Sequence, residues 1–225
     1  VTNTTDATST SSGSVQTLGG IGAAKTIYAG SDSYFNGVRV GRGNSSVSGN
    51  VAVGSGALNS NTTGNYNVSV GVNTLLNNTT GNNNVALCYA AMQNNISGAD
   101  NIAIGNGALF TNSSGQYNVA IGSSALNLNS TSGQNVAIGT SALANCTAYN
   151  NTAIGHQASY SNTSGQRNTM VGKGAGYTLT TGSNNTALGY GTLGSALAGS
   201  GNVALGYYAG AYSTGSNELY IDSQD

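Results

Sequence analysis

The chain has 225 residues, with 5 Lys or Arg, 6 Asp or Glu and a formal net charge of −1. So neutral a chain lacks the basic surface that binds nucleic acid or anionic membrane, and we expect neither nucleic-acid binding nor membrane insertion. The 35 glycines and the lack of Trp and Pro favour a thin, repeated core over a thick globular one.

The first two segments differ from the rest of the chain. Residues 1–17 are rich in Thr and Ser and are expected to be a linker or the end of an upstream segment. Residues 18–49 contain short β-branched and aromatic runs broken by glycine, which predict a short β-rich connector. Because it begins with Val1 instead of Met, we expect the chain to be a fragment or a processed product.

A five-residue phrase, seen as Asn101-Ile102-Ala103-Ile104-Gly105, recurs through residues 50–215. Its first Asn marks nine intervals, eight of 17 residues and one of 16. A fixed period of this size predicts an all-β fold, a parallel β-solenoid or β-roll of about ten stacked coils, roughly 45–50 Å long. The structural repeat is marked by Asn50, Asn67, Asn84, Asn101, Asn118, Asn135, Asn151, Asn168, Asn185 and Asn202, and by Gly54, Gly71, Gly105, Gly122, Gly139, Gly155, Gly172, Gly189 and Gly206.

Alternation along each phrase predicts two strand faces. In Val119-Ala120-Ile121 the branched residues point to one side and the alanine to the other. One face would fill the coil and the other would meet partner chains, and the pattern leaves open which is which. The following Ala125-Leu126 pair is expected to form the second inward wall. The glycine that ends each phrase indicates a corner with a positive φ angle, and Cys88 replaces it in one coil.

Stretches rich in Asn, Ser, Thr and Gly, such as residues 77–81, separate the coils and are expected to be solvent-facing turns. These side chains are neutral, so equivalent residues stacked on one another can form hydrogen-bond ladders without repulsion. The triplets Asn61-Thr62-Thr63 and Asn112-Ser113-Ser114 match the glycosylation signal, but a chain of this composition contains such matches by chance.

Few residues offer catalytic or metal-binding chemistry. His156 is the single histidine and is expected to be a corner residue, and Asp100 has no acidic partner for calcium. Cys88 and Cys146 lie more than three coils apart, which is too far for a disulfide and predicts two free thiols. We therefore expect no catalytic residue, no metal and no cofactor, and a protein that is not an enzyme.

Tyrosines become frequent in the last coils, where the repeat loosens. Tyr190, Tyr207, Tyr208 and Tyr212 are candidate receptor contacts, because an aromatic ring combines a flat apolar face with a polar tip. The alternative is that these rings only cap the last coils. Residues 216–225 break the phase of the repeat and are expected to form a C-terminal capping strand.

The phrase Asn-Val-Ala-Ile-Gly followed by a small-residue pair resembles the repeat in the heads of YadA-type trimeric autotransporter adhesins, over about residues 50–210. This resemblance implies a left-handed β-roll and a homotrimer, although the period here is longer and no stalk or membrane anchor is seen. Gly64-Asn65-Tyr66-Asn67, Gly215–Asp222 and the connector also resemble repetitive tail fibres of bacterial viruses. That second resemblance implies a chaperone segment after residue 225 that is cleaved off after assembly.

These resemblances lead to two expected functions. The first is a structural, host-receptor-binding tail fibre of a virion, whose partners are two further copies, other virion structural proteins and a glycan or protein receptor on the host surface. The second is the head of a microbial cell-surface adhesin, or an extracellular filament subunit. An ice-binding solenoid would need a flat, regular Thr array, which the variable turns lack.

Overall fold

The computed structural model describes residues 32–44, 47–195 and 198–222. The expected linker at residues 1–17 and the start of the connector lie outside them. Within these ranges the chain contains strands and turns and no helix, so no helix of this part could cross a membrane.

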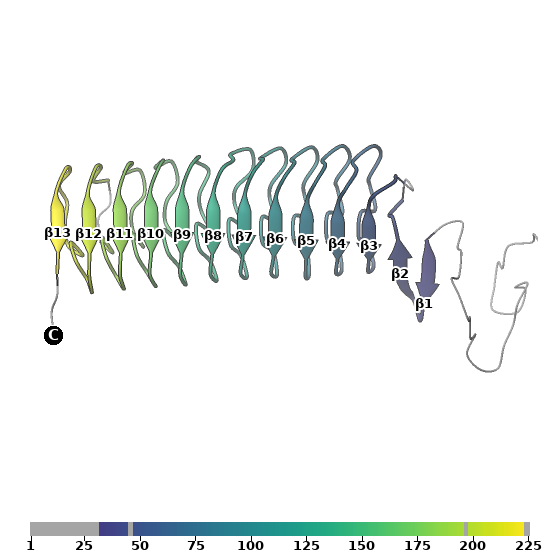
Figure 1. Cartoon of the computed structure of the whole chain (residues 1–225), viewed down its shortest axis with the longest axis horizontal. Coiled ribbons are helices and arrows are strands. Elements are labelled where there is room, and N and C mark those ends of the chain that lie inside the picture. Colours follow the sequence, from purple (N-terminus) through teal and green to yellow (C-terminus); the bar gives the residue numbers. More distant parts are fainter. Residues whose placement is uncertain (1–31, 45–46, 196–197, 223–225) are drawn as a thin grey trace, which may run out of the picture. The chain divides into compact units, whose positions relative to one another are not determined.

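Thirteen strands form a single sheet in which sequence neighbours are also spatial neighbours (Figure 1). β1 and β2 form an antiparallel hairpin, β2 pairs antiparallel with β3, and all later pairs are parallel and in register. The predicted parallel β-solenoid of about ten coils is therefore confirmed. The strands are β1 (Ser33–Phe35), β2 (Val38–Gly41), β3 (Val51–Val53), β4 (Val68–Val70), β5 (Val85–Leu87), β6 (Ile102–Ile104), β7 (Val119–Ile121), β8 (Val136–Ile138), β9 (Thr152–Ile154), β10 (Thr169–Val171), β11 (Thr186–Leu188), β12 (Val203–Leu205) and β13 (Leu219–Ile221).

The alanine face of each strand fills the coil. Ala120 is fully buried, whereas Val119 and Ile121 on the same strand stay partly exposed. Ala125 and Leu126, also fully buried, form the opposite wall as predicted. The interior is so thin that a methyl group on one wall meets a leucine on the other, which explains why the branched residues point outward.

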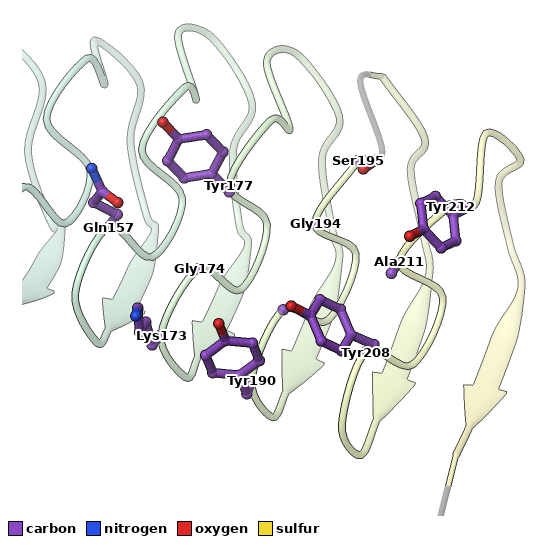
Figure 2. Close-up of a pocket in the computed structure, with 11 residues that line it drawn as sticks. Gln157, Lys173, Gly174, Tyr177, Tyr190, Gly194, Ser195, Tyr208, Ala211 and Tyr212 are labelled. Atoms are coloured by element: carbon purple, nitrogen blue, oxygen red, sulfur yellow. The ribbon is translucent and has the colours of Figure 1, made fainter. Parts of the chain in front are cut away.

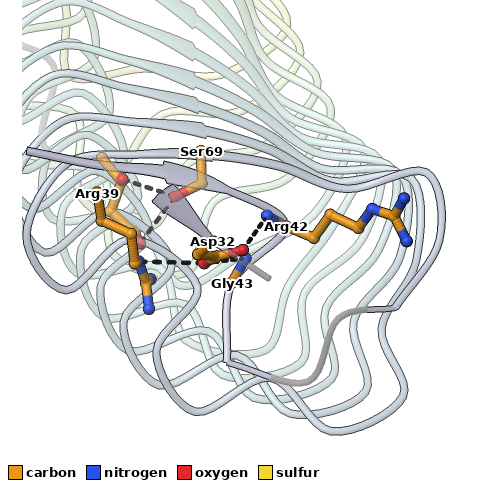
Figure 3. A network of polar contacts seen from close by, with 6 residues as sticks. Asp32, Arg39, Arg42, Gly43 and Ser69 are labelled. Carbon is orange, nitrogen blue, oxygen red and sulfur yellow. Dashed lines mark hydrogen bonds and ion pairs between the residues drawn. The ribbon is translucent and has the colours of Figure 1, made fainter. Parts of the chain in front are cut away.

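In two coils, a change of one inward residue is matched by a second change in the same coil. Ser69 replaces the strand alanine in β4, and its hydroxyl lies 2.6 Å from that of Thr74, which replaces the alanine of the Ala-Leu pair (Figure 3). In β10 the larger Met170 occupies the strand position, and Gly176 stands where other coils carry leucine. A Cβ added to Gly176 would lie 2.8 Å from the Met170 sulfur. In this coil the methionine thus fills the space that a leucine side chain fills elsewhere.

The asparagine that opens each phrase forms a buried ladder along the stack. Asn101 donates its side-chain amide to the Gly115 carbonyl at 2.8 Å. Its Oδ1 accepts the backbone N–H of Asn118 in the next coil at 2.9 Å. The same two bonds recur along the stack, with Asn151 for example donating to Gly165 and accepting from Asn168. Each asparagine therefore closes its own coil and joins it to the next one.

A second asparagine ladder runs inside the turns. Asn95 donates to the Oδ1 of Asn78 at 2.7 Å and to the Gly98 carbonyl at 3.0 Å. The prediction that these turns face solvent is therefore wrong for one residue in each, because its amide satisfies backbone carbonyls that the tight turn buries. Asn61 and Asn112, the glycosylation candidates, belong to this ladder and are buried. The ladder comprises Asn61, Asn78, Asn95, Asn112 and Asn129.

The corner glycines adopt the predicted positive φ angles, +130° at Gly122 for example. Cys88 takes the same corner at +87°. The leucine of the Ala-Leu pair is also left-handed, with φ +50° at Leu126, although the sequence offers no signal for it. The corner glycine and the leucine of the same coil are thus both left-handed.

Polar contacts are present at both ends of the stack. The Asp32 carboxylate accepts the backbone N–H of Arg42 at 2.7 Å and lies 3.6 Å from the Nε of the buried Arg39 (Figure 3). At the other end β13 is the last strand of the sheet. The last strand follows its partner by 16 residues, with Leu219 opposite Val203, so the 17-residue phase is broken there as expected. The ladder nevertheless continues, because the Glu218 N–H donates to the Oδ1 of Asn202 at 3.0 Å, as the asparagines do.

Candidate functional site

Three of the four tyrosines singled out in the sequence form one cluster near β11 and β12. Adjacent coils place equivalent residues directly above one another, so Tyr190 and Tyr207 stack with ring centroids 5.4 Å apart and planes 15° from parallel. Tyr208 meets both rings edge-on, with its centroid 4.6 Å from that of Tyr207 and 5.2 Å from that of Tyr190. All three rings remain exposed at the surface.

A hollow of about 220 Å³ opens beside these rings (Figure 2). We call it the tyrosine hollow. Tyr190 and Tyr208 line it, whereas Tyr207 packs against these two rings and is not part of the lining. Tyr212 stands at its rim with 89% of its surface exposed. The complete lining is Gln157, Lys173, Gly174, Tyr177, Tyr190, Gly191, Gly194, Ser195, Tyr208, Ala211 and Tyr212.

Lys173 and Tyr177 are functional candidates that sequence reasoning missed. The Lys173 ammonium lies 5.7 Å from the Tyr190 ring centroid, within reach of a cation–π interaction. The sequence could have indicated Lys173 only through its position. Lys173, Tyr190 and Tyr207 each follow a corner glycine, one coil apart. Tyr177 stacks on Tyr160 with centroids 5.4 Å apart, which extends the aromatic surface toward earlier coils.

The polar groups in and near the tyrosine hollow are mainly hydroxyls, together with the Lys173 ammonium. The hydrogen bond with Tyr190 raises the pKa of the Tyr208 hydroxyl, so this phenol is neutral at physiological pH. Hydrogen bonds from Tyr220 and Ser213 lower the pKa of Glu218, whose carboxylate stays ionised and engaged with them. Within the hollow, Lys173 is therefore the charged group, and no ion pair joins it to a carboxylate in the described part of the chain.

The remaining candidates stay apart from one another. His156 is exposed at a corner, as predicted, and Asp100 accepts a hydrogen bond from Asn83 at 3.0 Å. Both cysteines are free, as predicted. Burial raises the pKa of the Cys146 thiol to about 11, whereas Cys88 is exposed. Within residues 32–44, 47–195 and 198–222, no three His, Cys, Asp or Glu side chains gather as a metal site would require.

The tyrosine hollow is suited to binding a ligand with a flat apolar face and polar edges. The rings supply the stacking surface, and the phenol, amide and ammonium groups around them supply hydrogen bonds. Comparison of the chain with family models, with curated proteins and with solved structures found no match.

Proposed function

We propose that this chain is a structural and receptor-binding segment of a virion tail fibre, and that its tyrosine hollow contacts a glycan on the host surface. The observation that carries the proposal is the hollow itself, an exposed group of stacked rings beside an unpaired ammonium. Sugar rings present apolar C–H faces that pack on aromatic rings, and hydroxyls that bond to their polar edges. The protein would act outside the cell, with other virion proteins as neighbours.

A homotrimer of left-handed coils is part of this proposal. It is supported by the outward strand face, which leaves one unbroken column of apolar side chains partly exposed along the stack and a second column that is interrupted by Thr152, Thr169 and Thr186. Continuous apolar surface of this length is typical of an interface, and a face without charge allows identical copies to approach. The columns contain Val51, Val53, Val68, Val70, Val85, Leu87, Ile102, Ile104, Val119, Ile121, Val136, Ile138, Ile154, Val171, Leu188, Val203 and Leu205.

Replacing Ile121 with lysine tests the trimer. We expect the variant to dissociate or to aggregate, because three ammonium groups would meet near one axis in an apolar interface. Size-exclusion chromatography with light scattering measures the mass. Asn106→Lys places the same charge on an exposed corner and should leave the trimer intact. A wild-type chain that is a stable, folded monomer would contradict the homotrimer.

Substituting Tyr208 with alanine tests the receptor site. We expect attachment to host cells to fall by about 10-fold or more, as for an aromatic hot-spot residue, with a modest change in melting temperature. Tyr66→Ala removes an exposed ring far from the hollow and is the matched control. Unchanged attachment with a large loss of stability in a Tyr207→Ala, Tyr208→Ala double variant would mean that the rings only cap the stack.

The head of a microbial cell-surface adhesin is the second candidate, favoured by the Asn-Val-Ala-Ile-Gly phrase. The same stack and hollow would serve that role. The complete gene separates the two, because a tail fibre would carry a virion-attachment domain and an adhesin would carry a membrane anchor.

A further inference from the structure

Two coils, residues 135–150 and residues 202–217, are a residue shorter than the others, and the backbone bonds of the first show which residue is missing. In the longer coils two consecutive turn residues, such as Thr62 and Thr63, donate their N–H groups to a single carbonyl of the next coil. Such pairs of donors run from Thr62 to Ser114 and resume at Thr163. Between them, Thr147 donates a single bond of this kind. We call residues 135–150 the short coil.

The side-chain ladder locates the gap. Asn135 donates to the Ala148 carbonyl at 2.8 Å, as Asn118 donates to the Ser132 carbonyl at 3.0 Å. Ala148 is therefore the equivalent of Ser132, and the short coil lacks an equivalent of Thr131. The row of turns thus has a gap directly beside Thr131.

A tyrosine borders the gap. Tyr149 follows Ala148, and its hydroxyl donates to the Thr131 carbonyl at 3.3 Å. The equivalent residue one coil earlier is Gly133, and two coils earlier it is Gln116. Glycine leaves the space between Tyr149 and the earlier coil open. A hollow of about 260 Å³ results, lined by Ser114, Gln116, Tyr117, Thr131, Gly133, Gln134 and Tyr149. We call it the short-coil notch.

We propose that the short-coil notch binds one neutral sugar residue of a polysaccharide between Tyr117 and Tyr149. These tyrosines belong to coils two steps apart, about 10 Å along the stack, which leaves room for a single pyranose ring. Both rings are exposed, at 59% and 43%.

The lining decides the class of ligand. It contains no charged side chain, and its polar groups are the amides of Gln116 and Gln134 and the hydroxyls of Ser114 and Thr131. Amides and hydroxyls both donate and accept, which matches the hydroxyls and acetamido groups of a neutral sugar. A carboxylate-bearing sugar would lose water there without gaining a cation. The notch thus differs from the tyrosine hollow, which contains Lys173.

The test uses the whole chain labelled with 3-fluorotyrosine and observed by ¹⁹F NMR, with each signal assigned by a Tyr→Phe variant. The probes are oligosaccharides of neutral hexoses, of N-acetylhexosamines and of uronic acids. We expect a neutral probe to shift the signals of Tyr117 and Tyr149 together. Failure of every neutral probe to shift them at concentrations up to about 10 mM would overturn the proposal, and so would equal shifts by the uronic acids.

Four variants separate ring stacking from a general effect on the fold. Tyr149→Ser should weaken binding by about 10-fold or more, whereas Tyr149→Phe keeps the ring and should retain most of it. Inserting one serine between Thr147 and Ala148 restores the common length and should abolish binding by closing the notch. Tyr66→Ser should bind as the wild type does. Full binding by the Tyr149→Ser variant would overturn the proposal even if the insertion variant failed to fold.

This inference is independent of the receptor site at the tyrosine hollow. Tyr208→Ala should leave the shifts of Tyr117 and Tyr149 unchanged, since its ring lines the other hollow. Loss of host attachment in that variant with intact binding at the notch would support both sites. If the variant keeps both host attachment and binding at the notch, only the proposed receptor site at the tyrosine hollow is contradicted.

Discussion

Replacing Asn101 with alanine is expected to lower the free energy of unfolding by about 3–5 kcal/mol, because several buried polar groups lose their partners at once. The Asn101 amide donates to the Gly115 carbonyl and, at 3.2 Å, to the Oδ1 of Asn84. Its own Oδ1 accepts both the N–H and the Nδ2 of Asn118. The Asn101 side chain is fully buried, so these bonds are shielded from solvent in the native stack.

Denaturant unfolding followed by circular dichroism measures the effect. Asn106→Ala is the matched control, since Asn106 is exposed on the corner of the same coil and its loss should cost less than about 0.5 kcal/mol. Equal destabilisation of the two variants would show that the ladder contributes nothing beyond an exposed amide. Hydrogen exchange should show the earliest loss of protection at β6 and β7, on either side of the removed amide.

Replacing Gly122 with alanine is expected to cost about 4–6 kcal/mol, because the new methyl group combines an unfavourable φ angle with a backbone clash. The φ angle of +130° is unfavourable for any residue with a side chain. In addition, the new Cβ would lie 2.6 Å from the carbonyl carbon and oxygen of Gly139 in the next coil. Backbone cannot yield as a flexible side chain does, so the two coils must separate locally.

Gly174→Ala isolates the conformational part of this cost. Gly174 has a φ of +66°, and an added Cβ would meet nothing within 4 Å. That variant should therefore lose only about 1 kcal/mol. A similar loss in both variants, measured by thermal unfolding, would mean that the approach of neighbouring coils at Gly122 is not limiting. Cys88 is the natural comparison, because its smaller φ of +87° shows a corner that has shifted to admit a side chain.

The repeat phrase was sufficient to predict the coils, the corner glycines and the Ala-Leu wall. It could not decide which strand face is buried, because alternation defines two faces without saying how wide the coil is. The recurrence of alanine at one position, as in Ala103, Ala120 and Ala137, was the available clue, since a confined interior admits only a methyl group there.

The turn ladder was missed because polar composition indicates exposure in most loops. Its signal was present as an asparagine followed three residues later by glycine, as in Asn78 with Gly81 and Asn95 with Gly98. The left-handed leucines could not be predicted, because leucine has no preference for positive φ. The two hollows could not be predicted either. Each is lined by residues from three or more coils, and nothing in the sequence indicates which of these residues lie together.

The in-register pairing of the coils has a mechanical consequence. Hydrogen bonds between coils run along the stack, so a force pulling its two ends apart acts along these bonds and loads every interface between coils equally. The weakest interface therefore yields first, and each full-length coil that then unravels frees 17 residues, about 55–60 Å of extended polypeptide.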